Sequence, residues 1–442
     1  MKLDYCKGKY NPFEINEIIF KKESGYKKLI PDSFRKTGVF VVIIRTLYIT
    51  LRSFLSGIFP ILKNNLKDMF DNKCLFVIPT VNNQRALQKV IDIVQYKKDN
   101  VRVAIKDFGF GLYVALMSLP YLPILWYKYT KLTIEEKRLV SYYLENFVFA
   151  SGFVEFYFRI LQKYKPECVV FANDHIYMTK SLELVCEDLK IQTIYVQHAS
   201  VSYAFPELHF AYSFLDGKDS LLKYTSFGKK SIGNIIILGA ARYDGLSSYR
   251  NNRNPHNRNC IGVAINLLDD NDIVKDFCKD VLLTHPNLKI KIRSHPALKD
   301  KPFKFDDDER IIYTCATDEP MTDYLDSIDF QVSGDSCVHF DAIIGGVNTI
   351  VYNLSKKCFS DNYQYVKSGF IKFAENIEQV FEFANCHPDI SLVRFYDESY
   401  QKTYSGKCSD IIAEFIIKGY NLEILKKYDL EIFKQGYTQN SF

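Results

Sequence analysis

The sequence has 442 residues but a single tryptophan, and none of its eleven cysteines belongs to a Cys-x-x-Cys pair. Scattered cysteines are more typical of reduced thiols in a cytoplasm than of a disulfide framework. No secretory signal follows Met1, and the glycine-rich phosphate loops of P-loop and dinucleotide-binding proteins are also missing. These absences favour a cytoplasmic location and disfavour both ATP hydrolysis by a P-loop and ordinary NAD binding.

The chain also has only a small excess of positive over negative charge. The formal net charge is +5 and is spread along the chain, whereas nucleic-acid binding requires a concentrated basic face. We therefore expect no nucleic-acid partner. The hydrophobic content of 47% supplies enough core for two domains, on a rough prior of about 100–200 residues each.

Two hydrophobic segments early in the chain are too interrupted to be good membrane-spanning helices. The first, Val39–Leu62, is apolar around most of a helix and carries Arg45 and Arg52 on one side. It fits either a helix in a membrane interface, with its arginines facing anionic headgroups, or a buried helix of the first domain. The second, Phe108–Trp126, contains two prolines, which favours a hydrophobic wall or a one-sided membrane contact over a spanning helix.

From residue 73 onward, short buried runs alternate with helical patterns. Repeated strand–helix–strand units of this length predict a parallel, right-handed, doubly wound sheet. The strands expected in the first half are Cys74–Ile78, Val101–Ile105, Cys168–Ala172, Ile191–Val196 and Ile235–Leu238. Those expected in the second half are Ile261–Ile265, Lys289–Arg293, Arg310–Tyr313, Phe330–Val332 and Asn348–Tyr352.

The predicted fold class is therefore α/β, with two Rossmann-like doubly wound domains facing a cleft, where small-molecule sites usually lie. Residues 247–259 have no apolar periodicity and are interpreted as a solvated linker. The expected divisions are a partly helical N-terminal extension with possible membrane contact (1–72), an N-terminal domain (73–246), the linker (247–259), a C-terminal domain (260–395) and a C-terminal helical segment (396–442).

Two strand ends in the second half present polar turns. Arg293-Ser294-His295-Pro296 follows one strand, and Ser333-Gly334-Asp335-Ser336 follows another and leads into a short helical run. Ligands of open parallel sheets bind at this end of the strands, and a helix N-terminus offers unpaired N–H donors to phosphate. The two turns therefore predict a nucleotide site.

The same pieces resemble the donor-site motifs of bacterial GT-B glycosyltransferases. The turn at His295-Pro296 is similar to their His-Pro motif. Ser333–Ser336, with Phe340-Asp341, is similar to the serine-bearing turn of sialyl- and polysialyltransferases and of CDP-glycerol glycerophosphotransferases. Gln197-His198 resembles the Gln-His-Gly turn of capsule and lipopolysaccharide transferases, although Ala199 replaces the glycine. The resemblance covers roughly residues 165–355.

This resemblance implies a nucleotide-activated donor on the C-terminal domain, an acceptor on the N-terminal one, and no obligate metal or other cofactor. His295 would donate a hydrogen bond to the departing phosphate, and Asp341 would accept one from a ribose hydroxyl. The alternative is that His295 caps a loop and Ser336 is only a helix N-cap. The residues expected to bind the donor are Arg293, Pro296, Ser333, Gly334, Asp335, Ser336 and Asp341.

Glycosyl transfer also needs a base for the acceptor hydroxyl. Asp174, His175 and His198 follow adjacent predicted strands in the N-terminal half. His198 is the first choice because it resembles the histidine of the Gln-His turn, and Asp174 is the second, as a base or as a carboxylate that orients an imidazole. A purely structural histidine is the alternative.

The sequence thus predicts a cytoplasmic enzyme, peripheral on the inner membrane, that transfers a sugar from a nucleotide donor to a surface-glycan or lipid-linked acceptor. A CMP- or CDP-linked donor is expected from the resemblance alone. Two alternatives remain open. A UDP-sugar 2-epimerase would need more carboxylates in the cleft, and a noncatalytic scaffold of glycan assembly would bind no nucleotide.

Overall fold

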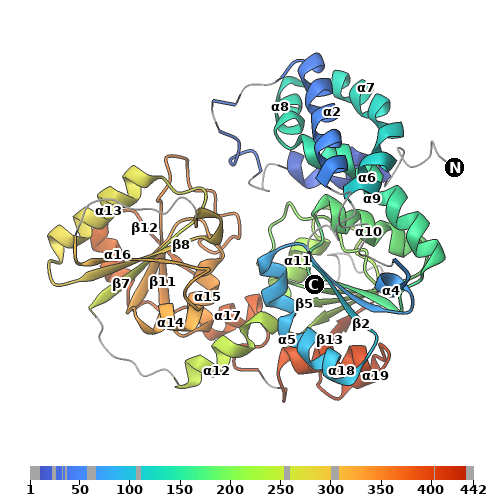
Figure 1. Ribbon diagram of the computed structural model, residues 1–442. Coiled ribbons are helices and arrows are strands. Elements are labelled where there is room, and N and C mark those ends of the chain that lie inside the picture. The colour runs from blue at the N-terminus through green and yellow to red at the C-terminus, as the bar shows by residue number, and fades with distance from the viewer. Residues whose placement is uncertain are drawn as a thin grey trace. The chain divides into compact units, whose positions relative to one another are not determined.

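The computed structural model describes residues 10–21, 26–31, 33–34, 37–56, 66–105, 111–252, 259–299, 308–402 and 404–434. The chain divides into two compact units (Figure 1). The first comprises Met1–Arg242 together with Thr403–Phe442, and the second comprises Tyr243–Lys402. Each unit is built on one sheet, and the predicted class of two Rossmann-like α/β domains is confirmed. The cleft expected between them stays a prediction.

The sheet of the first unit has seven strands in the order β13-β6-β5-β4-β3-β1-β2, and all pairs are parallel except β13 with β6. Counted along the chain, the order begins 2-1-3-4-5, a doubly wound arrangement whose switch point lies between β1 and β3. The strands are β1 Cys74–Ile78, β2 Val101–Ile105, β3 Cys168–Phe171, β4 Gln192–Val196, β5 Tyr212–Leu215, β6 Asn234–Ile237 and β13 Glu431–Phe433.

Alternate residues of β1 enter two different cores, as the two-residue period of a strand requires. Leu75 and Val77 pack on one face of the sheet, and Phe76 and Ile78 on the other. The helices of this unit are α1 Pro12–Ile15, α2 Val39–Ser56, α4 Leu66–Phe70, α5 Val81–Lys97, α6 Gly111–Ser118, α7 Leu122–Lys131, α8 Ile134–Tyr142, α9 Leu144–Lys163, α10 Tyr177–Asp188, α11 Lys218–Thr225, α18 Cys408–Ile417 and α19 Glu423–Lys426.

The second sheet has six parallel strands in the order β12-β11-β10-β7-β8-β9. In chain order this is 3-2-1-4-5-6, the Rossmann order, with its switch point between β7 and β10. The strands are β7 Cys260–Ile265, β8 Lys289–Ser294, β9 Ile311–Cys315, β10 Phe330–Ser333, β11 Asn348–Tyr352 and β12 Lys372–Ala374. The helices are α12 Asp244–Asn252, α13 Asn271–Thr284, α14 Met321–Asp326, α15 Val338–Ile344, α16 Ile377–Phe383 and α17 Ile390–Tyr396.

Part of the predicted linker is a helix. Residues 244–252 form α12, where Tyr249 donates a hydrogen bond to Asp326 at 3.1 Å and Arg250 lies over the Tyr400 ring at 4.2 Å. These contacts with other parts of the second unit stabilise a helix that has no apolar periodicity of its own. Residues 253–258 of the predicted linker lie outside the described ranges.

Both ends of the chain also belong to the first unit. Ile411 and Phe415 of α18 are fully buried beside α5, so the predicted C-terminal helical segment is part of that core. Ile15 and Ile18 of the N-terminal extension are buried on the other face of the sheet.

The segment from residue 134 to residue 163 forms two helices, α8 and α9, and not one continuous helix. They meet at Tyr143, which leaves the helical conformation and whose hydroxyl donates a hydrogen bond to the Tyr26 carbonyl. Further along, α9 crosses α6 closely at Gly152, where a Cβ would lie 2.4 Å from the Val114 carbonyl oxygen. Within the described ranges, no helix combines the length and the apolar content that crossing a membrane requires.

Candidate functional site

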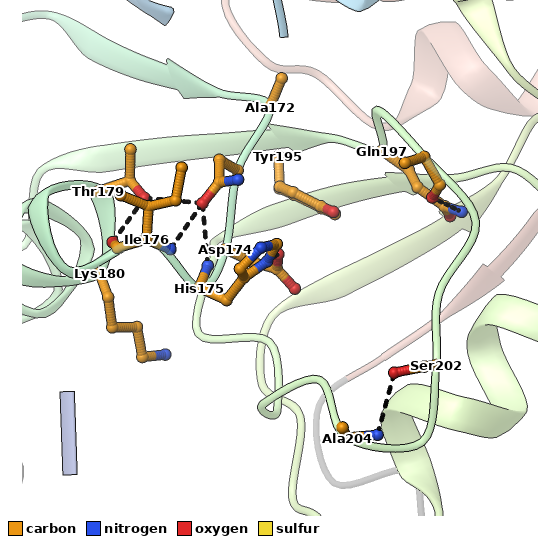
Figure 2. A network of polar contacts seen from close by, with 12 residues as sticks. Ala172, Asp174, His175, Ile176, Thr179, Lys180, Tyr195, Gln197, Ser202 and Ala204 are labelled. Carbon is orange, nitrogen blue, oxygen red and sulfur yellow. Dashed lines mark hydrogen bonds and ion pairs between the residues drawn. The ribbon is translucent and has the colours of Figure 1, made fainter. Parts of the chain in front are cut away.

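The turn after β3 is organised by Asn173. Its side-chain oxygen accepts hydrogen bonds from the backbone N–H groups of His175 at 3.1 Å and Ile176 at 2.7 Å, and from the Thr179 hydroxyl at 3.1 Å. An Asx turn of this kind reverses the strand into the start of α10. Figure 2 shows the result, with Asp174 and His175 side by side at the carboxyl end of the strand.

Asp174 lies at the centre of a buried chain of hydrogen bonds. One carboxylate oxygen lies 2.8 Å from Nδ1 of His175, and the other accepts a 2.7 Å bond from the Tyr224 hydroxyl. Tyr224 in turn lies 3.1 Å from the hydroxyl of Tyr195 on β4. Burial by itself raises the pKa of Asp174, but the bonds from His175 and Tyr224 outweigh it, so the net shift of the pKa is downward. Asp174 is thus an ionised carboxylate in the interior.

His175 is the member of this chain that remains partly accessible, with 14% of its side chain exposed. With Nδ1–H directed at Asp174, the imidazole carries its free lone pair on Nε2. The ring lies against Phe205, with 4.7 Å between ring centroids. A carboxylate that fixes the tautomer of a histidine in this way is the arrangement that general bases use.

His198 lies close to His175, with ring centroids 6.2 Å apart, so the structure brings the three candidate bases together. Its own setting is different. Burial lowers the pKa of His198 to about 3, and its Nδ1 has no hydrogen-bond partner among the described residues. His198 is therefore neutral near pH 7 and has little affinity for a proton.

Arg242 and Asp216 stabilise the Gln197-His198 turn. Arg242 donates to the Gln197 carbonyl at 3.2 Å and forms a two-bond ion pair with Asp216. The Gln197 side chain spans the turn itself, from the Asp216 N–H to the Ala199 carbonyl. Ala199 does not adopt positive φ, so a glycine is not required there.

In the second unit, the turn after β7 lies between the two predicted donor turns. The register pairs Ser294 of β8 with Ile265 of β7, and Ser333 of β10 with Ala264 of β7, so both strands end at the same edge of the sheet. The His295 N–H donates to the Ile265 carbonyl at 3.0 Å. Since β8 and β10 are separated by one strand, their ends lie roughly 10 Å apart.

Gly334 allows the turns after β7 and β10 to come together. A Cβ at this position would lie 2.6 Å from Oδ1 of Asp269, so a larger residue would displace that carboxylate. The other oxygen of Asp269 accepts a 2.7 Å bond from the Asn266 N–H. Burial, with the nearby charge of Asp335, raises the pKa of Asp269 to about 7.

Several of the predicted donor residues have internal partners. Arg293 is 4% exposed, faces Glu319 at 3.4 Å and lies over the Tyr324 ring at 5.0 Å. The Ser333 hydroxyl donates to the Ala264 carbonyl at 2.6 Å. The Asp335 carboxylate accepts from the Ser360 hydroxyl and the Asn362 N–H.

Both His295 and Ser336 make local contacts, but only His295 is the cap residue that its alternative interpretation describes, because the N-cap of α15 is Cys337. Nδ1 of His295 accepts a 3.1 Å bond from the Ala297 N–H, in a short 3-10 turn that Pro296 opens. Ser336 accepts a 3.3 Å bond from the Val338 N–H at the start of α15, and Asp341 lies in that helix. Neither contact uses all the hydrogen-bonding capacity of the side chain.

His339 has a role that the sequence did not reveal. It is buried on α15, where Nε2 lies 2.8 Å from the Gly334 carbonyl and Nδ1 lies 2.6 Å from the Thr349 hydroxyl. Burial lowers the pKa of His339 to about 4. The neutral ring therefore ties the Gly334 turn to β11. The sequence signal that could have indicated this role is a histidine five residues after Gly334, the glycine that follows β10.

A cavity of about 540 Å³ lies elsewhere in the first unit, among α1, α7 and α8. Its lining includes Phe13, Lys21 and Leu132 but none of the predicted site residues. Among the residues that the structure describes, no group of three or more histidine, cysteine or acidic side chains could hold a metal ion.

Comparisons with known proteins give structural likenesses only. No protein-family model matches the chain, and no curated protein matches it. The UDP-GlcNAc 2-epimerase from Neisseria meningitidis bound to UDP-GlcNAc is 14% identical, with a TM-score of 0.46 over 78% of this chain and 100% of that chain. The glycosyltransferase SnogD from Streptomyces nogalater is 12% identical, with a TM-score of 0.41 over 78% and 99%. The glycotransferase of kitacinnamycin is 9% identical, with a TM-score of 0.47 over 80% and 100%. The assignment of two Rossmann-like sheets comes from their strand orders and does not depend on these likenesses.

Proposed function

We propose that the protein is a GT-B-type glycosyltransferase that transfers a sugar or sugar-like unit from a nucleotide donor to a surface-glycan or lipid-linked acceptor, as in capsule or lipopolysaccharide assembly. The observation that carries the proposal is the switch point of the second sheet. There the Rossmann strand order and the close approach at Gly334 create the kind of edge where such sheets bind nucleotides. The preference for a CMP- or CDP-linked donor rests on the resemblance of the Ser333–Ser336 turn.

The second unit would hold the donor through the three turns at this edge. The Gly334 turn lets backbone N–H groups approach a phosphate, and Ser336 adds a hydroxyl. His295, at the neighbouring strand end, would donate a hydrogen bond to the phosphate oxygen that leaves with the nucleotide. Arg293 would support the turn without contacting the donor, because its partners Glu319 and Tyr324 hold it inside the unit.

The first unit would activate the acceptor, and its geometry favours His175 as the base over His198. In the proposed reaction, Nε2 of His175 takes the proton of the acceptor hydroxyl as its oxygen bonds to the sugar carbon. The bond from that carbon to the phosphate oxygen breaks, and the nucleotide leaves with the electron pair. Asp174 would orient the imidazole and stabilise the imidazolium that forms. His198 would contribute a neutral ring beside it.

Thermal-shift titration with CMP, CDP, UDP, GDP and their sugar conjugates tests this function. A ligand at about a hundred times its Kd stabilises the folded state by roughly 2.7 kcal/mol, which is readily visible. We expect stabilisation by a cytidine nucleotide and sugar transfer only when an acceptor is present. Turnover of a nucleotide sugar without an acceptor would indicate an epimerase instead, and no response to any nucleotide would indicate a scaffold.

A further inference from the structure

The strongest feature outside the proposed site is the exposed face of α2. Six large apolar side chains on this helix each have between 50% and 74% of their surface exposed. At 100° per residue they fall on one continuous stripe along the helix. The stripe consists of Phe40, Ile44, Leu47, Tyr48, Leu51 and Leu55.

The opposite face of α2 anchors the helix to the rest of the unit. Val42 and Ile49 are buried there, and the helix packs against α6, α7 and α9. The Arg45 guanidinium donates to the Ser141 carbonyl at 2.8 Å. The helix is therefore held in place by one side while its stripe faces outward. The buried-helix interpretation therefore holds for one face of α2, and the membrane-interface interpretation stays a prediction for the other.

The neighbouring helices carry further exposed apolar side chains. Three more are exposed: Leu116 on α6, Leu119 in the turn that follows α6, and Tyr127 on α7. Isolated exposed apolar residues are ordinary, but a stripe of six on one helix, with more on the helices that pack against it, is typical of an interaction surface.

The charges of α2 favour an anionic lipid surface over a second copy of the chain. The helix has no acidic residue, and its only charged side chains are Arg45 and Arg52. Arg52 lies at the border of the stripe, is 54% exposed, and pairs with Glu145 of α9. Arg45 is held by the Ser141 carbonyl, so Arg52 is the cation that a partner would meet. A second copy paired through α2 would offer it no acid on its own α2, whereas phosphate headgroups complement it.

We propose that the α2 stripe is a membrane-docking surface, which inserts its apolar side chains at the headgroup boundary of a bilayer that contains anionic phospholipid. The helix would lie in the plane of the interface. Docking would bring the first unit to a membrane surface, where lipid-linked acceptors reside. The inference stands on α2 alone and does not require the proposed function.

Co-sedimentation of the full chain with vesicles of phosphatidylethanolamine and phosphatidylglycerol tests the proposal. We expect binding by the unchanged protein and a loss of at least about tenfold for each of Ile44→Asp and Leu51→Asp, since each removes a side chain whose burial drives insertion. Leu283→Asp is the matched control, because Leu283 is 78% exposed on α13 of the second unit. It should bind vesicles as the unchanged protein does.

Far-UV circular dichroism and thermal unfolding of the same variants without nucleotide show that they fold, which keeps this test separate from the proposed function. Equal sedimentation of Ile44→Asp, Leu51→Asp and Leu283→Asp would overturn the proposal, as would no vesicle binding by the unchanged protein. A concentration-dependent dimer that Leu51→Asp dissociates, without vesicle binding, would assign the stripe to self-association instead.

Discussion

In both sheets, polar turns follow the carboxyl ends of parallel strands, but the groups in these turns differ in their chemistry. At the edge of the first sheet, Asp174, His175 and Tyr224 form a chain of side-chain hydrogen bonds around a buried charge. At the edge of the second, Gly334 lies close to Asp269, and the Asn266 amide donates to the Asp335 carbonyl at 3.5 Å, so two backbone turns meet. The first arrangement suits movement of a proton, and the second suits the binding of a phosphate. Under the proposed function, catalysis and donor binding would be divided between the units.

A pair of aspartates makes the contrast specific. The pKa of Asp174 is lowered because two donors outweigh its burial, whereas the pKa of Asp269 is raised to about 7 because burial and the charge of Asp335 act together. The same side chain at equivalent sheet edges is therefore a fixed anion in one unit and a titratable acid in the other. What differs is the number of hydrogen-bond donors supplied around each carboxylate.

The largest effect is expected at the proton-transfer site. His175→Ala should lower kcat by about 10²–10⁴-fold, the usual contribution of a general base, while the affinity for nucleotide stays the same. Steady-state kinetics and nucleotide titration measure the two quantities separately. His209→Ala is a matched control in the same unit, since His209 pairs with Glu207 and Glu187 instead of Asp174. Equal losses in both variants would remove His175 from the mechanism.

Arg293→Ala should act on stability rather than on one step. It removes a buried cation from Glu319 and from the Tyr324 ring, and we expect the free energy of unfolding to fall by about 3 kcal/mol. Urea unfolding checks this value. Lys299→Ala removes an exposed ammonium paired with Asp318 and should cost far less. Full stability with lost nucleotide affinity would show that Arg293 contacts the donor directly.

Asp269→Asn tests the pH dependence of the second edge. The folded-state pKa of about 7 lies above the unfolded value of 3.8, so the folded wild type retains a proton that the unfolded chain releases. Wild-type stability should therefore fall, relative to the variant, as the pH rises from about 4 to 7, by on the order of 1–3 kcal/mol. Denaturant unfolding across this pH range measures the difference, and a constant difference would contradict the shift.

The smallest effect is expected for Ser336→Ala. The hydroxyl accepts one bond, from the Val338 N–H, and its loss should cost about 0.5–1 kcal/mol of stability. If Ser336 also contacts a phosphate, nucleotide affinity should fall several-fold in addition. Thermal unfolding with and without nucleotide separates the two roles. An unchanged nucleotide shift would leave Ser336 only the role of accepting the bond from the Val338 N–H.

The sequence predicted the central strands of both sheets because they are continuous buried runs. It missed β5, β12 and β13, which have four, three and three residues and are too short for a run of apolar residues to mark them. It also assigned part of α12 to a linker, since that helix is stabilised by Tyr249 and Arg250 through contacts with distant residues. Local pattern carries no information about such contacts.

The candidate site was predictable in its positions but not in its roles. Asp174, His175 and His198 could be placed together because adjacent parallel strands end at one edge. Their ranking depends on Tyr224, which lies fifty residues beyond Asp174 in the chain and bonds to it, and on the burial that keeps His198 neutral. In the second unit, the partners of Arg293 and the support of Gly334 by His339 likewise arise from tertiary packing.

Calorimetric titration of CMP and CDP into Gly334→Ala and His175→Ala tests the division between the units most directly. A Cβ at Gly334 would collide with Asp269, so we expect that variant to lose nucleotide affinity by at least about tenfold, or 1.4 kcal/mol, while His175→Ala binds as the wild type does. Unchanged affinity in Gly334→Ala, or a loss confined to His175→Ala, would contradict the assignment of the donor to the second sheet.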